Sequence, residues 1–328
     1  MKIFVVYEIS KNPYFTLSQE GFDDRLSEFV QPSEINNLIK ALQQNGHQVE
    51  VVDGPSELLL RHDDIKQNRG IVFNKSIGYK GLERKIQVPA ICQLFSIPCI
   101  GTSAYGMTLA RHKYHTNLVI MGAGIRTAVS RIVFPGANIS LEGLAFPLIV
   151  KPNHESDSLG IDENSVHYGP ANLEAAINFL HEQFQQPVII EEFIPGEEWK
   201  IPVIGNYPAS CAIGGVGVLK NGKTMEGTLQ TRKDVIDDMF DYYNLRENQL
   251  KDQAMRIAAR VHDLLELRDY SRCDFRLDAN GELVCMEVAT HPDISSNSSF
   301  IAAALQIYES YEAIIEKIVN TALARFQF

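Results

Sequence analysis

An alternation of strand-like and helix-like segments at the start of the chain restricts its fold more than any other feature. The segments "KIFVVYE", "HQVEVVDG" and "GIVFN" have the apolar runs typical of buried strands. The segment "SEINNLIKALQQNG" carries apolar residues at helical spacing, with Ser33 as the predicted N-cap and Gly46 as the predicted end. Because strands that alternate with helices form parallel sheets, the sequence predicts an open parallel α/β domain over residues 1–105.

Two further regions follow, and they predict an α/β chain with α+β lobes. Residues 106–190 contain a helix, a glycine turn, the strand "PLIVKP" and the amphipathic helix "NLEAAINFLHEQFQQ". The stretch "PVIIEEFIPGEEWK" is predicted as one strand that ends among acids. Residues 191–328 contain a helical stretch at 248–267, two strand-like runs joined by a turn at 271–292, and a long helical region after Ser298.

Charge and hydropathy narrow the class of protein. The net charge of −11 argues against general nucleic-acid binding, although it is compatible with one local basic pocket. No apolar run reaches the roughly 18 residues of a membrane span, and "MKIFVVYEIS" lacks a signal peptide's long apolar core. Cys273 and Cys285 lie within strand-like runs and are expected to be small buried hydrophobes. We therefore expect a cytoplasmic protein with no nucleic-acid or membrane partner.

Two carboxylates stand in the apolar-rich runs of the segment "SRCDFRLDANGELVCMEVATHP". Asp274 lies in the first run and Glu287 in the second, and the composition of both runs predicts burial. A buried acid is costly unless it is paired or binds a metal. Arg272 shares a strand face with Asp274, because strand residues two apart point to the same side, and a salt bridge between them is one interpretation.

Two other stretches have residues suited to a nucleotide. Lys151 ends the strand "LIVK" and precedes the small-residue loop "NHESDSLG", whose backbone N–H groups are suited to phosphates. The strip "EEFIPGEEW" offers acids beside Phe193 and Ile194, which suits an adenine edge and ribose hydroxyls. The alternatives are a surface loop with one lysine and an ordinary strand end. The chain has no GxxxxGK[ST] phosphate loop.

Five separated motifs in order resemble the ATP-grasp fold, and specifically the D-alanine–D-alanine ligase family, from about residue 80 to the C-terminus. They are Lys113, "PLIVKP", "IIEEFIPGEEW", "RCDFRLDANGEL" and "MEVATHP" with the following "NSS". The resemblance implies ATP-grasp lobes after the N-terminal α/β domain. Ligases of this family are commonly dimers, so a homodimer is one of the oligomeric states that the sequence leaves open.

The resemblance implies a role for each motif residue. Arg272 would hold the acyl phosphate and the tetrahedral intermediate. Ser298 would contact the second substrate's carboxylate, cap a helix, or do both. Asp274 and Glu287 would bind Mg²⁺ (or Mn²⁺), an ion that prefers hard carboxylate oxygens. The residues implied for ATP are Lys113, Lys151, Glu155, Ser158, Glu191, Glu192, Phe193, Ile194 and Glu198.

The chain departs from the family pattern at several positions. Ala289 replaces a metal-binding asparagine, so that a second ion would need water, His291 or Asn297 as a ligand. Asp293 replaces a glycine, and Asp157 replaces a loop serine that helps to hold the first D-alanine. The N-terminal Gly-Gly-x-Ser-x-Glu turn is missing around residues 8–24, and the tyrosine-rich lid sequence is missing between residues 219 and 241, where Arg232 or Lys233 is the candidate third phosphate contact.

Nucleotide motifs are therefore largely kept, whereas first-substrate motifs are changed. This pattern predicts an ATP-dependent carboxylate–amine ligase that forms an amide through an acyl phosphate. Its partners would be small, amino-acid-like carboxylate and amine substrates, with a carboxylate other than D-alanine. Two alternatives stay open: an authentic D-alanine–D-alanine ligase, and a non-catalytic ATP-binding protein of the same fold.

Overall fold

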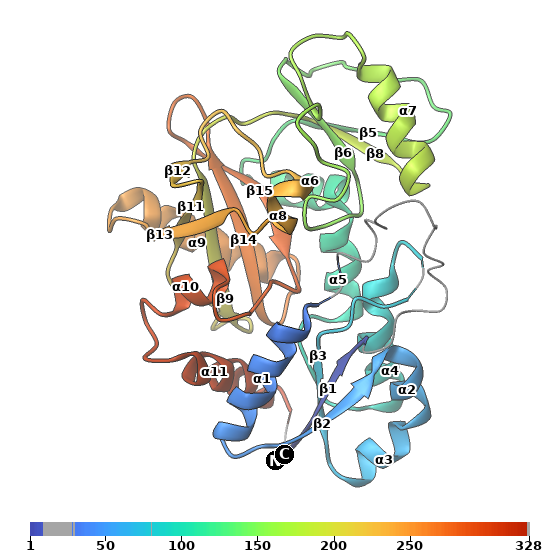
Figure 1. The fold of residues 1–328 in the computed structure, drawn as a ribbon, viewed down its shortest axis with the longest axis vertical. Helices are drawn as coiled ribbons and strands as arrows, with labels where there is room; N and C mark the ends of the chain where they lie inside the picture. Colours follow the sequence, from blue (N-terminus) through green and yellow to red (C-terminus); the bar gives the residue numbers. More distant parts are fainter. Residues whose placement is uncertain (9–27, 29, 80, 327–328) are drawn as a thin grey trace.

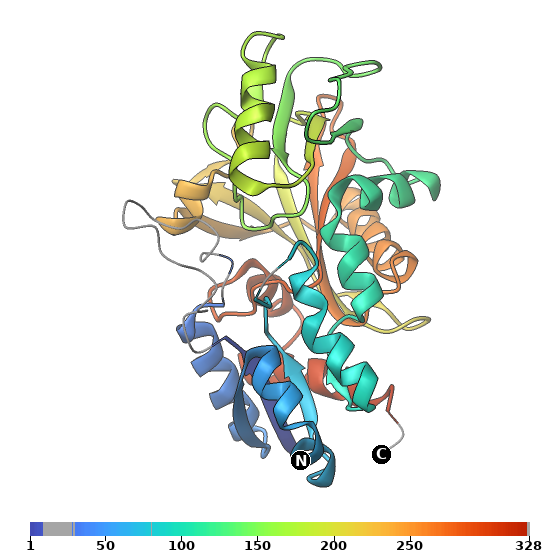
Figure 2. The ribbon, with the colours of Figure 1, turned by 90° about the vertical axis from the view of Figure 1, so that its right-hand side faces the viewer.

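The computed structural model describes residues 1–8, 28, 30–79 and 81–326. Within these residues the strands form three sheets, each in a lobe of its own. Figures 1 and 2 show the N-terminal sheet at one end of the long axis, a small four-stranded sheet at the other end, and a seven-stranded sheet between them. No helix in the described part of the chain is both long enough and apolar enough to cross a membrane.

The N-terminal sheet is parallel, as predicted, with the strand order β2-β1-β3-β4. Its strands are β1 (Lys2–Tyr7), β2 (Gln48–Asp53), β3 (Ile71–Asn74) and β4 (Cys99–Ile100). Its helices are α1 (Pro32–Gln44), α2 (Gly54–Leu60), α3 (His62–Gln67), the 3₁₀ turn η2 (Arg84–Ile86) and α4 (Gln87–Phe95).

The predicted N-cap of α1 is wrong. The N-cap is Gln31, two positions before the expected residue, and Pro32 lies in the first turn. Proline fits there because its φ is already helical and its missing N–H is not needed. Ser33 therefore lies inside the helix. The predicted C-terminal end is confirmed, since Gly46 follows the helix with a φ of 82°.

The small sheet has the antiparallel order β5-β8-β6-β7. Its strands are β5 (Ser130–Val133), β6 (Leu148–Pro152), β7 (Val166–His167) and β8 (Val188–Glu192), and its helix is α7 (Leu173–Phe184). The apolar face of α7 packs on the sheet through Leu173, Ile177 and Leu180. Helices α5 (Ala104–Arg111) and α6 (Lys113–Gly122) connect this lobe to the N-terminal one.

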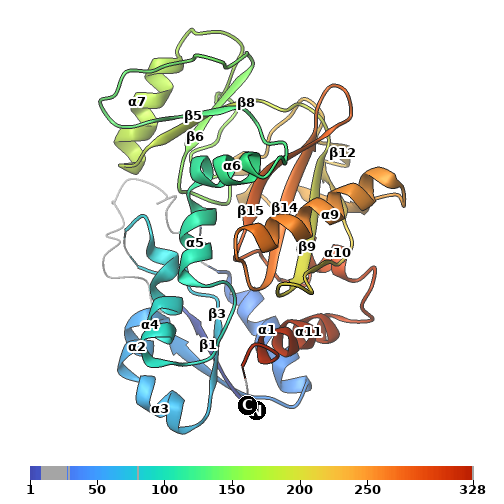
Figure 3. The same cartoon turned by 180° about the vertical axis from the view of Figure 1, so that it is seen from behind.

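The large sheet has the order β12-β11-β9-β14-β15, with β10 beside β9 and β13 beside β11. Its strands are β9 (Glu198–Gly205), β10 (Cys211–Ala212), β11 (Val216–Lys220), β12 (Lys223–Thr224), β13 (Phe240–Asn244), β14 (Asp269–Leu277) and β15 (Leu283–Ala289). The remaining helices are α8 (Arg232–Ile236), α9 (Gln249–Leu264), α10 (Ser299–Ala304) and α11 (Tyr311–Leu323). Figure 3 shows α9 lying across one face of this sheet, where it packs on β9 and β14.

The single strand predicted over "PVIIEEFIPGEEWK" is wrong, because the segment forms two strands, β8 and β9, in different sheets. The break falls at Pro195 and Gly196. A Cβ on Gly196 would lie 2.1 Å from the carbonyl oxygen of Leu277, so the chain needs glycine where it passes β14. This break places Glu191 and Glu198 on separate lobes.

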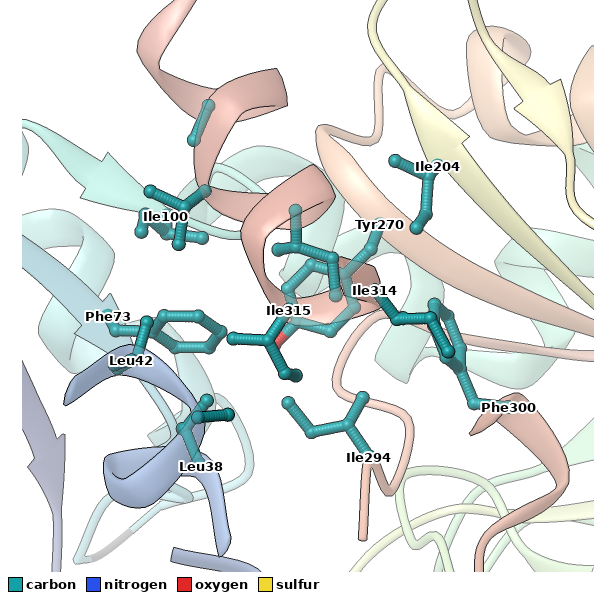
Figure 4. Packing of buried hydrophobic residues seen from close by; sticks show 14 of the residues in the cluster. Leu38, Leu42, Phe73, Ile100, Ile204, Tyr270, Ile294, Phe300, Ile314 and Ile315 are labelled. Atoms are coloured by element: carbon teal, nitrogen blue, oxygen red, sulfur yellow. The ribbon is translucent and has the colours of Figure 1, made fainter. Parts of the chain in front are cut away.

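The last helix, α11, packs against both the N-terminal lobe and the large sheet. Ile314 and Ile315 of α11 are fully buried in one cluster that also contains Leu38 of α1 and Phe73 of β3 (Figure 4). On its other side the cluster includes Tyr270 of β14. The N-terminal and large sheets therefore share a core, and the domain limits at residues 105 and 190 stay predictions.

We predict that Ile315→Ala lowers the free energy of unfolding by about 2–5 kcal/mol, because it removes buried methylene groups and leaves a cavity in this shared core. Urea denaturation measures the change. The matched control is Ile307→Ala, since that side chain is 56% exposed. Equal effects of the two substitutions would contradict the shared core.

Candidate active site

A cleft of about 790 Å³ lies where the three lobes meet, and seven of the predicted site residues line it. These are Lys113, Glu155, Ser158, Arg272, Asp274, Glu287 and Ser298. Lys151, Glu191, Glu192, Phe193, Ile194 and Glu198 are not among the residues described as lining the cleft. Glu198 is joined to the lining by an ion pair with Lys200, whereas Lys151 and Glu191 pair with each other.

Asp274 is the centre of the charges on the large sheet. Its register places it opposite Lys200 on β9 and opposite Glu287 on β15. Arg272 donates to both carboxylate oxygens of Asp274, from Nε at 2.6 Å and from Nη2 at 2.8 Å, which confirms the predicted salt bridge. Lys200 Nζ donates to Oδ2 at 3.0 Å. Burial alone would raise the pKa of Asp274, but Arg272 and Lys200 outweigh it and lower the pKa to about 2.

Glu287 pairs with Lys113 across two lobes. The Lys113 Nζ lies 2.5 Å from Glu287 Oε1. The prediction that both acids are buried is wrong for Glu287, because 39% of its side-chain surface is exposed. It stands on the cleft side of β15, so its carboxylate is open to a ligand. The partial burial of the carboxylate raises the pKa of Glu287, but the Lys113 ammonium outweighs it and keeps the pKa below its usual value.

Lys151 forms a second lysine–acid pair, within the small sheet. Its Nζ lies 2.5 Å from Oε2 of Glu191, and Asn117 donates to the other oxygen of that acid at 2.8 Å. Both side chains are buried, since β6 and β8 are neighbours at this point. The charge of Glu191 acts to raise the pKa of Lys113, and the charge of Lys151 acts to lower the pKa of Glu287. The two ion pairs therefore form one cluster.

The predicted adenine strip is held by Arg276. Its Nη1 donates to the carbonyl oxygen of Ile194 at 2.9 Å, and its guanidinium lies 5.5 Å from the centre of the Phe193 ring. Glu198 accepts from Arg276 at 3.1 Å and contacts Lys200 at 3.0 Å. Glu192 is not part of this group, because its carboxylate accepts from the N–H of Ala145 at 3.0 Å.

The loop after β6 contacts the N-terminal lobe. Glu155 accepts from Arg84 at 3.0 Å, from Arg111 at 3.4 Å and from Gln186 at 2.8 Å, so its carboxylate is already satisfied by protein partners. Asp157 and Ser158 both have left-handed backbone, with φ of 53° and 58°. The exposed Asp157 lines the cleft, where Arg232 Nη1 donates to its carbonyl oxygen at 2.9 Å. Arg232 and Lys233 are the two candidates for a third phosphate contact. Arg232 is among the described residues that line the cleft, and Lys233 is not.

Sequence reasoning missed a buried acid, Glu28. Its side chain is fully buried and accepts from Arg84, with Arg111 at 3.6 Å and Lys85 at 3.8 Å. It also accepts from the N–H of Ser156 at 2.9 Å. No periodic pattern marks this acid, because its partners come from distant segments. Of the segment at residues 8–24, where the family turn is missing, all but Glu8 lies outside the described residues.

The segment after β15 carries the departures from the family pattern. Ala289 lies opposite Arg272 and offers no ligand atom. Both ring nitrogens of His291 are buried without a hydrogen-bond partner among the described residues. Ser298 accepts from the N–H of Ile301 at 3.3 Å and caps α10, which confirms one of its two predicted roles. Asp293 accepts from the N–H of Ser295 at 2.7 Å.

Three lobes around a cleft of paired acids and lysines define a class of protein, the ATP-grasp fold. Solved structures show the same fold over nearly the whole chain. A D-alanine–D-alanine ligase from Bacillus anthracis, solved with ATP, has a TM-score of 0.75 at 18% identity and covers 99% of this chain and 98% of its own. A D-Ala:D-Ser ligase from Enterococcus faecalis has a TM-score of 0.73 at 21% identity, with 98% and 99% covered.

The family model "D-ala D-ala ligase C-terminus" matches residues 137–320, and the chain belongs to this family. Among its relatives is a D-alanine–D-alanine ligase of Halalkalibacterium halodurans, which is 27% identical over 90% of this chain and 95% of the relative. Another is the uncharacterized protein y4sG of Sinorhizobium fredii, 27% identical over 89% of this chain and 88% of the relative.

We predict that Glu28→Gln destabilises the protein at pH 7 by about 3–5 kcal/mol, because it breaks a buried ion network on one side. Burial raises the pKa of Glu28, but Lys85, Arg111 and Arg84 together hold it well below the ordinary 4.5. Its stabilisation is therefore present above pH 4.5 and lost as the pH falls toward the folded-state pKa.

Urea denaturation at pH 7 and at a series of lower pH values measures this difference. The gap between the wild type and Glu28→Gln should narrow below pH 4.5. Glu163→Gln, at an exposed glutamate, is the control. A gap that stays constant with pH would show that Glu28 does not titrate as argued.

Proposed function

We propose that this chain is an ATP-dependent ligase that joins a carboxylate to an amine through an acyl phosphate. The observation that carries the proposal is a set of cations, each beside an acid, that line the cleft (Lys113, Lys200 and Arg272) or lie behind its wall (Lys151). A carboxylate and a triphosphate repel each other unless fixed positive charge brings them together and stabilises the transferring phosphoryl group. The names of the relatives, D-alanine–D-alanine ligases, support the same reaction class.

We assign ATP phosphates to Lys113 and Lys151, which can exchange their carboxylate partners for phosphate oxygens. Adenine and ribose are assigned to the strip between the lobes, formed by Glu191, Phe193, Ile194 and Glu198. Of the other residues predicted for ATP, Ser158 keeps that assignment because it lines the cleft. Glu155, which also lines the cleft, and Glu192 stay predictions for this role.

Arg272 is assigned to the acyl phosphate and Ser298 to the carboxylate of the second substrate. Both line the cleft. Asp274 and Glu287 face each other in register, and their hard carboxylate oxygens fit a Mg²⁺ (or Mn²⁺) ion. When bound, such an ion would neutralise phosphate charge. Arg272 remains a fixed guanidinium that can bind an anionic group on the same side of the sheet.

The carboxylate substrate is proposed to be amino-acid-like but not D-alanine. Asp157 stands in the cleft where the ligases have a serine. The carboxylate of Asp157 would repel a small substrate carboxylate held nearby, so we propose a bulkier substrate or one with a positive group at that point. D-alanine is the alternative favoured by the names of the relatives.

The test of the proposed reaction is release of ADP and phosphate from ATP in the presence of pooled amino acids and amines, with mass spectrometry of the product. The proposal expects turnover that requires both a carboxylate and an amine and yields a new amide. ATP binding without turnover in any pool would favour the non-catalytic alternative.

We predict that Lys151→Ala weakens ATP binding tens-fold or more, because charge-assisted contacts to phosphate contribute roughly 1.5–3 kcal/mol each. Titration calorimetry measures the affinity. Lys223→Ala, at an exposed lysine of β12, is the matched control and should bind as the wild type does. Unchanged affinity in Lys151→Ala would remove the phosphate assignment.

We predict that D-alanine as sole substrate, at millimolar concentration, gives little or no ADP. Asp157→Ser should raise this rate, because it restores the residue found in the ligases and removes one negative charge. ADP release and product mass are the readouts. Robust formation of D-alanyl-D-alanine by the wild type would return this chain to the ordinary ligases.

A further inference from the structure

Lys200 occupies a place between two acids of the candidate active site. It lies on β9 directly opposite Asp274 on β14. Its Nζ is 3.0 Å from Asp274 Oδ2 and 3.0 Å from Glu198 Oε1. The side chain is only 6% exposed, and the residue lines the cleft. A full positive charge is therefore fixed beside one of the two acids assigned to the metal.

Asp274 has little capacity left for metal ions. An ionised carboxylate has about four lone-pair positions for donors or ions. Arg272 takes one position on each oxygen, and Lys200 takes a further one on Oδ2. About one position, on Oδ1, remains. This is enough for contact with one ion.

On β15 the site lacks a further side chain that could bind a second ion. Ala289 shares the face of β15 that carries Glu287, because the two residues are two apart, and its methyl group cannot bind an ion. Nor does His291 compensate, since no three His, Cys, Asp or Glu side chains form a metal-binding group among the described residues. The other candidate, Asn297, lines the cleft, but its Oδ1 already accepts from Ser295 Oγ at 3.0 Å. A second ion would therefore depend on the two acids that the first ion uses.

The local charge also opposes a second ion. Three cations, Arg272, Lys200 and Arg276, stand against the two acids Asp274 and Glu198. A further divalent cation at this end would meet a group that already carries an excess of positive charge. Mg²⁺ bound with phosphate needs only one or two protein carboxylates, so Asp274 and Glu287 are sufficient for one ion.

We propose that this site binds a single divalent ion with ATP, shared by Glu287 and Asp274, and that the Lys200 ammonium supplies the positive charge that a second ion would bring. The inference rests on the proposed function, because it concerns the nucleotide site of that reaction. Lys200 is thus a positioning and charge-supplying residue. Ala289 stands where the family pattern has an asparagine ligand for the second ion.

The test counts ions on the complete protein by equilibrium dialysis with Mn²⁺ and adenylyl imidodiphosphate, a non-hydrolysable ATP analogue. The bound Mn²⁺ and the bound nucleotide are each the excess in the protein chamber over the buffer chamber. Their ratio is the number of ions bound per nucleotide. The wild type should reach one ion per nucleotide, and its Mn²⁺ spectrum by electron paramagnetic resonance should show no coupling between two ions.

Two double variants separate charge from ligand. Ala289→Asn with Lys200→Met supplies a ligand and removes the charge, and it should reach two coupled ions per nucleotide. Ala289→Asn with Lys200→Arg supplies the same ligand but keeps a positive charge, and it should stay at one. Lys251→Met is the control, because Lys251 is equally buried on α9 but lies away from the cleft, paired with Glu247 and Gln306.

Two coupled ions in the wild type would overturn the inference and leave the proposed function standing. A Lys200→Met, Ala289→Asn double variant that binds nucleotide with one ion would also overturn it. If the wild type binds no nucleotide with Mn²⁺, the proposed function itself is wrong and the inference falls with it.

Discussion

The antiparallel register of β14 with its two neighbours is the constraint on which the rest of the site depends. It sets Asp274 opposite Lys200 on one side and opposite Glu287 on the other. From these positions the ion pairs reach Lys113 at the start of α6 and Glu198 at the start of β9. A shift of β14 by one residue would turn Asp274 to the opposite face of the sheet and separate it from Lys200 and Glu287. The large sheet thus fixes the positions of these charges and holds Lys113 of α6 by an ion pair.

These pairs are poor explanations of stability. Charges taken out of water lose hydration that their mutual attraction only partly offsets, so buried ion pairs are often no more stabilising than apolar residues of the same size. The stability of this chain comes instead from apolar burial, including the core that α11 shares with α1 and the N-terminal sheet. Paired lysines and acids in a cleft suit a binding role, because each lysine is held in place and can exchange its acid partner for an anionic ligand.

Local patterns predicted what depends on neighbouring residues in the chain. The parallel N-terminal sheet, the helix after Asn248 and the cap at Ser298 follow from periodicity and capping chemistry, and the structure confirms them. The errors arose where one local signal competed with another. Pro32 displaced Ser33 as the start of α1, and the Pro195–Gly196 pair broke a run of apolar residues into two strands. The roles of Lys200 and Glu28 could not be found in this way, because Asp274 beside Lys200 and Arg84 beside Glu28 lie in distant segments that only the fold brings together.

The central claim is that these charges serve transfer of a phosphoryl group to a carboxylate, and an oxygen-transfer measurement tests it most directly. A carboxylate oxygen attacks the γ-phosphorus, ADP leaves, and the amine then attacks the acyl carbon and expels phosphate with that oxygen attached. With ATP, the amine and an ¹⁸O-labelled carboxylate that supports turnover, the account predicts one ¹⁸O in each phosphate released, measured by mass spectrometry. Phosphate that carries no label, with ADP formed at the same rate, would contradict it.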